Sequence, residues 1–185
     1  MNAYDEELLT EALAEGWFDD APGVVRLADV QPERVSWLWP GRLPLGKLVV
    51  IDGDPSTGKS TLMLDLAARI TTNTPFPDGT RPGDGPAGAG VLLLSAEDGL
   101  ADTIAPRLIA AGADLEWVHA LTEVPVRDQD GITKMVPPSL PRDIPVIRRI
   151  VEDESVSLVI VDVLMAYLNG KVDSHRDQDV RGVLH

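Results

Sequence analysis

Cysteine is absent from this chain of 185 residues, which excludes disulfide bonds and thiolate metal sites. Long apolar runs are absent as well, and none approaches the roughly 18 residues that are typical of a membrane-spanning helix. The N-terminus, Met-Asn-Ala-Tyr-Asp-Glu-Glu, lacks the basic and apolar regions of a secretory signal peptide. These absences predict a cytoplasmic protein with no membrane partner.

Basic residues are scarce. The chain has 16 Lys and Arg against 30 Asp and Glu, which gives a net charge of −14. Tight binding along a nucleic acid depends on many Lys and Arg contacts to phosphates, so the composition does not support it. Contact through a few residues arranged in a ring stays open. Hydrophobic residues make up 44% of the chain, which is typical of a globular domain with a real core.

The chain is predicted to divide into an acidic N-terminal arm or leader, residues 1–38, and a folded core, residues 39–185. Within the arm, residues 5–14 have the apolar spacing of a short helix. Trp37 and Trp39 come just before two turn signals that contain Pro and Gly. We expect these tryptophans to pack in the core or at its edge rather than to stack on bases.

A glycine-rich stretch has the P-loop spacing G-x-x-x-x-G-K-[ST]. Glycines at both ends of such a loop permit unusual torsions, so that backbone N–H groups and a helix N-terminus can surround a phosphate. In this role Lys59 would reach the β- and γ-phosphates of a nucleotide, and the Ser60 hydroxyl would hold a magnesium ion. The predicted nucleotide-binding residues are Gly53, Asp54, Pro55, Ser56, Thr57, Gly58, Lys59, Ser60 and Thr61.

The residues on either side of this loop favour the same interpretation. Leu48 to Ile51 is an apolar, β-branched run, which predicts a strand. After the loop, apolar residues recur at helical spacing from Leu62 to Ile70, and the helix should end around Thr71 to Thr74, before Pro75. Strand, loop and helix therefore follow in the required order. The alternative is a glycine-rich turn that contains an unrelated lysine.

Two later apolar runs end in carboxylates. Val91 to Ser95 leads directly into Glu97 and Asp98, and Val156 to Val161 is followed by Asp162. The second run has the form of a Walker B element, with Asp162 as its acid. In α/β sheets the carboxyl ends of the strands are where ligands bind. The alternative for Asp162 is a helix cap or loop carboxylate.

The remaining elements are predicted from turn and cap signals. A helix should begin at Asp102 or Thr103, keep Pro106 in its first turn and place Ile104, Leu108, Ile109 and Ala111 in the core. The other expectations are a strand over Trp117–Leu121, a long excursion with a possible hairpin over Glu123–Arg142, a helix capped by Asp143, and a helix that starts near Ser174.

Four segments together resemble a known family: Gly53 to Thr61, Leu94 to Asp98, Val159 to Asp162, and Asp173 to Asp177. Over residues 25–185 the chain resembles the RecA-like P-loop ATPases, in particular the AAA-family branch of RepA-type plasmid replicative helicases. The resemblance implies an α/β fold, a mainly parallel sheet sandwiched by helices. It also implies ATP as substrate, magnesium as cofactor, a hexameric ring as the homo-oligomer, and single-stranded DNA as a further partner.

The resemblance also assigns catalytic roles. Glu97 matches the acid that activates the attacking water, and Lys59 matches the lysine that neutralises the phosphates. Asp162 matches the acid that helps to hold magnesium through its waters. Asp98 stays open as a competing candidate for the base. The residues alone agree, because hydrolysis needs a cation on the phosphates, a held metal and a carboxylate near the water.

Compared with this family, the chain is expected to be C-terminally truncated. Family members carry a further strand with a phosphate-sensing residue and later a basic finger, and both would lie beyond His185. Arg107, Arg176 and Arg181 could contact nucleotide or a neighbouring subunit. The alternative, which we expect for each of them, is a solvated surface residue or an ion-pair partner. The sequence therefore predicts a Mg-dependent ATPase that serves DNA replication or another nucleic-acid motor. The alternative is a nucleotide-binding switch or assembly module with little turnover.

Overall fold

The computed structural model describes residues 25–83, 89–127 and 130–168. Its contacts divide the chain into two units, Met1–Arg34 and Val35–His185. The described part of the first unit contains one 3-10 helix, η1 (Leu27–Asp29), and the Leu27 side chain is exposed. The helices predicted over residues 5–14 and from Ser174 lie outside the described residues.

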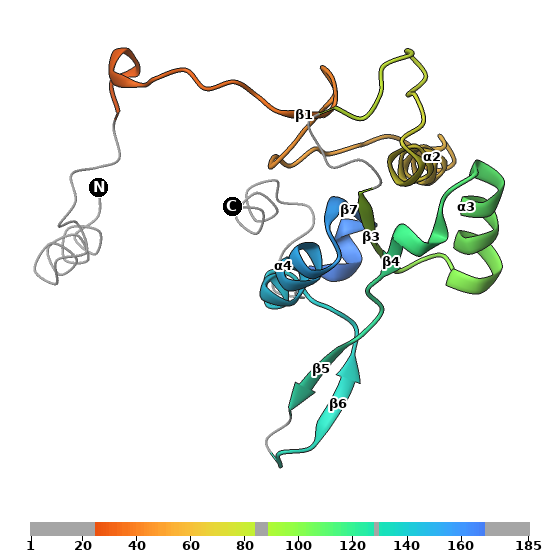
Figure 1. Ribbon diagram of the computed structural model, residues 1–185. Coiled ribbons are helices and arrows are strands. Elements are labelled where there is room, and N and C mark those ends of the chain that lie inside the picture. Colours follow the sequence, from red (N-terminus) through yellow and green to blue (C-terminus); the bar gives the residue numbers. More distant parts are fainter. Residues whose placement is uncertain (1–24, 84–88, 128–129, 169–185) are drawn as a thin grey trace, which may run out of the picture. The chain divides into compact units, whose positions relative to one another are not determined.

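A parallel three-stranded sheet forms the centre of the second unit, in the order β4–β3–β7 (Figure 1). The strands are β3 (Gly90–Ser95), β4 (Val118–Ala120) and β7 (Val156–Asp162). All three were predicted from the sequence and are confirmed. With the helices packed against this sheet, the predicted α/β class is confirmed too.

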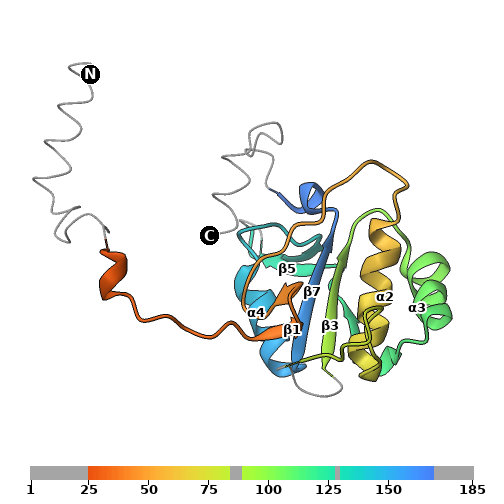
Figure 2. The ribbon, with the colours of Figure 1, turned by 90° about the horizontal axis from the view of Figure 1, so that it is seen from above.

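Helices cover both faces of the sheet, with α2 and α3 on one side and α4 on the other (Figure 2). For this reason β3 is an unbroken apolar run rather than an alternating one. Val91 and Leu93 belong to the core that also contains α2 and α3. Leu92 and Leu94 belong to a second core, against which Ile147 of α4 packs.

The helix after the P-loop, α2 (Lys59–Thr72), ends where the sequence predicts, at Asn73 in the left-handed conformation. The next helix differs from its prediction. A π-helical turn, η2 (Leu100–Ile104), leads into α3 (Ala105–Ala111), so the caps expected at Asp102 or Thr103 are wrong. Pro106 does lie in the first turn, because its missing N–H needs no partner there.

The buried face of this second helix was only half predicted. Ile104 and Leu108 are buried as expected. Ile109, which was expected in the core, is 63% exposed, and Ala111 is exposed as well. The physical reason is the short length of α3, since one apolar stripe on two turns is enough to pack it against α2.

The helix α4 (Ile144–Asp153) follows Asp143, as predicted, but the Asp143 side chain makes no capping hydrogen bond. Its carboxylate instead accepts a hydrogen bond from the backbone N–H of Ser139 at 2.7 Å and pairs with Arg142 at 2.6 Å. The hydrogen bond from Arg142 lowers the pKa of the Asp143 carboxyl below its usual value, although burial opposes this.

Two antiparallel hairpins flank the sheet. The pair β5 (Val124–Arg127) and β6 (Thr133–Val136) confirms the hairpin expected in the long excursion, and it projects away from the sheet (Figure 1). The pair β1 (Trp37–Trp39) and β2 (Leu43–Pro44) precedes the P-loop. Two short 3-10 helices, η3 (Leu115–Trp117) and η4 (Leu164–Tyr167), complete the described elements.

Trp39 packs as predicted. It is 9% exposed, and its ring stacks on Phe76 with the ring centroids 4.6 Å apart. The indole N–H donates to the Asp78 carboxylate at 3.0 Å, and the Arg42 guanidinium lies over the Trp39 ring. These contacts join the first hairpin to the segment that follows α2.

The strand predicted over Leu48–Ile51 is wrong. These four residues belong to no strand, and their exposed fractions are 61%, 42%, 69% and 39%. β-branched residues favour a strand only where they have a hydrogen-bonded neighbour and a face to pack on. Among the described residues the sheet ends at β7, and no strand pairs with its outer edge.

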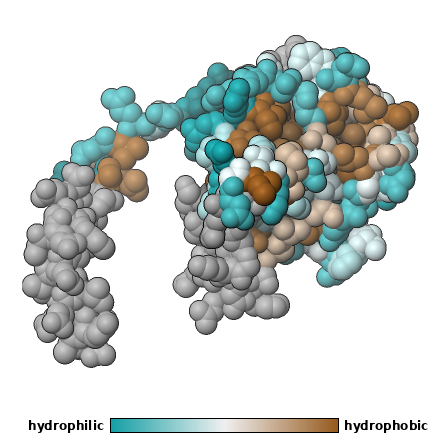
Figure 3. All heavy atoms as spheres, turned by 90° about the horizontal axis from the view of Figure 1, so that it is seen from below, coloured by the Kyte–Doolittle hydropathy of each residue, from teal (hydrophilic) through white to brown (hydrophobic). Residues whose placement is uncertain are grey.

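Apolar surface is therefore not confined to the interior. The face drawn in Figure 3 carries apolar side chains among polar ones. Within the described ranges, no helix is both long and apolar enough to cross a membrane.

Candidate functional site

The predicted phosphate loop has the backbone torsions that its glycines permit. Gly53 has a φ of 153° and Gly58 a φ of 89°, values that side-chain-bearing residues rarely adopt. Ser56 also has a positive φ, 64°. The helix α2 begins directly at Lys59, so the unpaired N–H groups of its first turn follow the loop.

Lys59 holds this loop closed. Its Nζ donates to the carbonyl oxygens of Gly53 at 2.7 Å and of Asp54 at 2.8 Å. The Thr57 hydroxyl donates to the same Asp54 carbonyl at 2.8 Å. The loop is thus shaped by bonds within itself, even though the Leu48–Ile51 segment directly before it forms no strand.

A cavity of about 480 Å³ opens at the loop. This volume lies within the range of about 300–1,000 Å³ that is usual for small-molecule sites. Six of the predicted loop residues line it, whereas Gly53, Asp54 and Thr57 do not. Glu97 and Asp162 line it as well, and so do Arg107 and Val163, which the sequence did not assign to a site. The six loop residues are Pro55, Ser56, Gly58, Lys59, Ser60 and Thr61.

The register of the sheet explains why the two acids meet. Ser95 and Asp162 are partners at the ends of the parallel strands β3 and β7. The Ala96 N–H then donates to the Asp162 carbonyl oxygen at 3.1 Å, so the chain stays beside β7 for one more residue. Glu97 follows at once. Because β3 and β7 end side by side, the residues at the ends of both strands line the same cavity.

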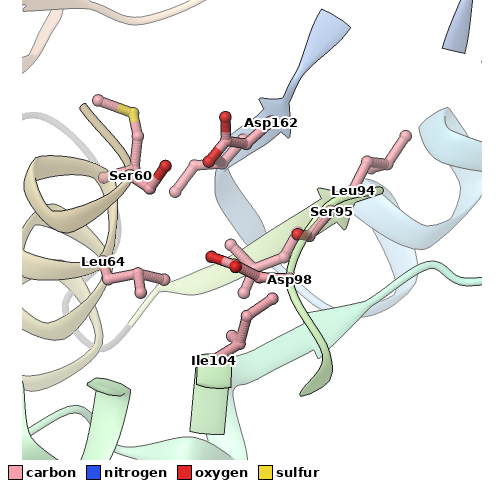
Figure 4. Close-up of a pocket in the computed structure, with 10 residues that line it drawn as sticks. Ser60, Leu64, Leu94, Ser95, Asp98, Ile104 and Asp162 are labelled. Carbon is pink, nitrogen blue, oxygen red and sulfur yellow. The ribbon is translucent and has the colours of Figure 1, made fainter. Parts of the chain in front are cut away.

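A second, smaller cavity of about 20 Å³ lies beside the first, and Ser60 and Asp162 line both. In Figure 4 the Ser60 hydroxyl and the Asp162 carboxylate face one space, with the Asp98 carboxylate next to them. Leu64 and Ile104 close the apolar side. A cavity of this size admits about one water molecule.

Glu97 and Asp98, although adjacent, have different surroundings. Oδ2 of Asp98 accepts a hydrogen bond from Nη1 of Arg107 at 3.0 Å, and the Asp98 side chain is 36% exposed. Glu97 is exposed on the larger cavity, and within the described ranges it has no hydrogen-bond or ion-pair partner. The two carboxylates that the sequence left as alternatives for the base are therefore distinguishable.

The surroundings of Ser60 and Asp162 fit a magnesium ion that binds together with a nucleotide. Among the described residues no group of three or more His, Asp or Glu side chains could hold a metal without further ligands. Magnesium commonly uses one or two carboxylates and takes its other oxygens from water and substrate phosphates. One hydroxyl and one carboxylate beside an open cavity meet that requirement.

A buried tyrosine lies near the end of β7. Tyr167 of η4 is 5% exposed, and its burial raises the pKa of its hydroxyl. The negative charge of Asp162 raises this pKa further. Tyr167 therefore stays neutral across the physiological pH range and adds no charge beside Asp162.

Arg107 was expected to be a solvated surface residue or an ion-pair partner, and it does form an ion pair, with Asp98. It also lines the cavity, in agreement with the alternative that it could contact nucleotide. It belongs to α3, which directly follows the π-helical turn η2 and packs against α2 through Ile104 and Leu108.

A search of curated proteins and a search of solved structures each gave no significant match. A family model described as an AAA domain matches residues 20–185, most of the chain, and this family implies a P-loop NTPase fold. With the loop, the parallel sheet and the match in agreement, the chain belongs to the AAA domain family.

Proposed function

We propose that this protein binds Mg-ATP at residues 53–61 and hydrolyses it. The observation that carries this proposal is the single cavity shared by Lys59, Glu97 and Asp162. These residues come from three separate segments, the loop and the ends of β3 and β7. A cation for the phosphates and two carboxylates in one cavity are what phosphoryl transfer to water needs.

Binding begins with the loop and Lys59. In the structure the Lys59 ammonium group donates to two neutral carbonyl oxygens. Hydrogen bonds between charged partners are roughly twice as strong as neutral ones, so phosphate oxygens compete well for this group. The N–H groups at the start of α2 supply further donors and a positive helix end.

Ser60 and Asp162 are proposed to hold magnesium, Ser60 through its hydroxyl and Asp162 through bound waters. When bound, the ion neutralises charge on the phosphates. The protein contributes the placement of both oxygen donors on one small cavity. That placement comes from the first turn of α2 and from the last residue of β7.

Glu97 is proposed as the general base that orients and deprotonates the attacking water. Among the described residues Glu97 has no hydrogen-bond or ion-pair partner, and it is exposed on the cavity, whereas Asp98 is paired with Arg107. A base must come within hydrogen-bond reach of the water, and a carboxylate that already accepts from a cation is less available for this. The surroundings of these two residues thus favour Glu97.

The nucleic-acid motor role is a further part of the proposal. It is supported by the resemblance to RepA-type replicative helicases, in which single-stranded DNA and a hexameric ring accompany ATP hydrolysis. The net charge of −14 favours a few local contacts to DNA over a broad basic surface.

A nucleotide switch with little turnover is the second candidate, and the exposed Leu48–Ile51 segment favours it. A phosphate loop that no paired strand supports can still bind phosphates through its own torsions. Turnover is more demanding, because misplacing the reacting groups by about 1 Å can cost about a hundredfold in rate.

Nucleotide binding and turnover, each compared between variants, test the proposal. Lys59→Ala should weaken ATP binding by about tenfold or more, since a charged hydrogen bond contributes about 1.5–3 kcal/mol. Lys47→Ala is the matched control, because Lys47 is exposed and does not line the cavity. Equal affinity for ATP in the parent, Lys59→Ala and Lys47→Ala would reject the phosphate site.

Steady-state ATPase rates with and without single-stranded DNA, together with light scattering for mass, separate the two candidates. Turnover that rises with DNA and a ring-sized mass support the motor. Binding without turnover supports the switch.

A further inference from the structure

The chain that follows Asp162, the carboxylate proposed to hold magnesium, is tied to a distant segment. It forms η4, and the carbonyl oxygen of Tyr167 in η4 accepts a hydrogen bond from the Leu140 N–H at 2.6 Å. Leu140 and Leu168 also form an isolated parallel bridge. Leu140 belongs to the segment between the hairpin β5–β6 and α4. The proposed function gives this tie no role.

Side chains strengthen the same tie. Leu140 is 7% exposed and Tyr167 is 5% exposed, and they belong to one buried cluster with Leu92 and Leu94 of β3. Leu94 also lines the smaller cavity together with Asp162 (Figure 4). The tie therefore packs on the strand that forms one wall of the magnesium cavity. The charge of Asp162 raises the pKa of Tyr167, so these two side chains lie within electrostatic reach of each other.

Asp143 shapes the turn that presents Leu140. It is 6% exposed, and its carboxylate accepts a hydrogen bond from the Ser139 N–H at 2.7 Å. Arg142 donates two hydrogen bonds to the same carboxylate, of 2.9 and 2.6 Å. The Asp143 N–H in turn donates to the Ser139 carbonyl oxygen at 2.9 Å. Residues 139–143 therefore form a closed turn, which fixes the backbone of Leu140.

The partners of the Asp143 carboxylate indicate what it serves. Burying a charge costs free energy unless the charge is paired and hydrogen-bonded, so its partners matter. Asp143 directly precedes α4, yet its side chain makes no capping hydrogen bond to that helix. The bonds to Ser139 and Arg142 hold the turn instead. The buried charge thus serves the segment that contacts Tyr167.

We propose that Asp143 is a positioning residue for Asp162. Its turn holds Leu140 against Tyr167, and this contact fixes the chain just after the end of β7, where the Asp162 carboxylate faces the smaller cavity. On the other side, the Ala96 N–H already holds the Asp162 carbonyl oxygen. Asp143 lines neither cavity, so it acts only through the position of Asp162. This inference rests on the proposed function.

Equilibrium binding of ADP to the full chain at rising magnesium concentration tests this role. ADP lacks the terminal phosphate, so the measurement reports binding of the ion and not turnover. Asp143→Ala should raise the magnesium concentration at half-maximal effect by about tenfold, since losing a residue that supports a metal ligand commonly costs about 10–100-fold in metal affinity. ADP affinity without magnesium should not change, because the loop and Lys59 bind the phosphates.

Asp143→Asn is the conservative variant. Its amide oxygen can still accept from the Ser139 N–H, but the charge that pairs with Arg142 is lost. This variant should recover part of the magnesium response.

Phe76→Leu is the matched control. Phe76 is 2% exposed and stacks on Trp39, so its substitution lowers stability. It lies after the C-terminal end of α2, whereas the loop precedes the N-terminal end, and it has no part in the tie. Phe76→Leu should keep the magnesium response of the parent.

Thermal unfolding followed by circular dichroism shows whether each variant is folded. If Asp143→Ala is not, Leu140→Val provides the test, because it leaves the turn in place and reduces the contact with Tyr167. Leu140→Val should also raise the magnesium concentration at half-maximal effect.

Unchanged magnesium responses in Asp143→Ala and Leu140→Val would overturn the inference. So would an equal shift in Phe76→Leu, because the tie would then matter only for stability. If the parent chain binds no ADP, or binds it without dependence on magnesium, the proposed function fails and this inference with it. If Asp162→Asn weakens the magnesium response while the Asp143 and Leu140 variants keep it, only this inference fails.

Discussion

The phosphate loop and the acidic strand ends lie on one cavity, but different kinds of interaction hold them in place. Bonds within the loop itself shape it, through Lys59 and through the torsions of Gly53 and Gly58. Pairing between β3 and β7 holds Glu97 and Asp162 together, across a long separation in the chain. The loop therefore depends on local residues, and the acids depend on the register of the sheet.

The difference extends to the segments that precede each part. β3 is buried along its length, whereas Leu48–Ile51 before the loop is exposed. A substitution in the sheet should therefore affect the two acids by lowering the free energy of unfolding. A substitution in the loop should weaken nucleotide binding with little change in the free energy of unfolding. Four experiments can break or sharpen this comparison.

The largest effect is expected at Glu97. Glu97→Gln removes the base and keeps the shape, so turnover should fall by about 10²–10⁴-fold while ATP binding stays unchanged. The measurement is a steady-state ATPase rate beside an equilibrium binding constant. Glu116→Gln is the control, since Glu116 is exposed and lines neither cavity. A variant of Glu97 that turns over at the parent rate would transfer the role of base to Asp98.

Substitutions at Gly90 and Gly53 separate an effect on stability from an effect on nucleotide binding. A Cβ at Gly90 would lie 2.7 Å from the Glu154 carbonyl oxygen, where β3 meets the start of β7. Gly90→Ala should therefore lower the free energy of unfolding by about 1–3 kcal/mol, as overpacked sites do. Gly53→Ala strains a torsion in the loop instead, and should weaken ATP binding more than it lowers stability.

Denaturant unfolding and nucleotide titration of both variants provide the check. If Gly53→Ala lowers stability as much as Gly90→Ala does, then the loop is not independent of the sheet.

Asp78 gives a smaller effect that depends on pH. The pKa of the Asp78 carboxyl is lowered to about 2, chiefly by a hydrogen bond from Thr80. A hydrogen bond from Trp39 and the charge of Arg42 lower this pKa as well, and burial opposes them. Because the pKa is lower in the folded state than its unfolded value of about 3.9, the stabilisation is present above that value. It is lost as the pH falls through the folded pKa of about 2.

Asp78→Asn should therefore be less stable than the parent at pH 7, and the two unfolding curves should converge as the pH approaches 2. Thermal unfolding across this pH range is the measurement. A difference that stays constant with pH would mean that packing, and not the charge of Asp78, holds the first hairpin to the segment after α2.

The smallest effect is expected at Val50, which is 69% exposed. Val50→Ser should change the free energy of unfolding by no more than about 0.5 kcal/mol, as surface substitutions usually do. Leu92→Ala is the core control, and should cost about 2–5 kcal/mol because Leu92 is 1% exposed. A loss at Val50 close to that of the core control would show that this segment is buried in solution.

The local features of the protein could be read from its sequence. The loop spacing, the helix that ends before Pro75, and the apolar runs that become β3 and β7 all follow from neighbouring residues, because torsional preference and periodicity act over a few positions. The same holds for Pro106 in its first turn and for the hairpin β5–β6. The same motifs were enough to predict the AAA domain family.

Only the tertiary structure decided the rest. A β-branched run predicts a strand at Leu48–Ile51, but a strand exists only where a neighbour pairs with it, and the described sheet ends at β7. The resemblance favours Glu97 over Asp98 as the base, and only the tertiary structure shows that Asp98 is paired with Arg107 of α3. The residue types and spacings determined the chemistry that the chain carries, and long-range packing decided which of these groups meet.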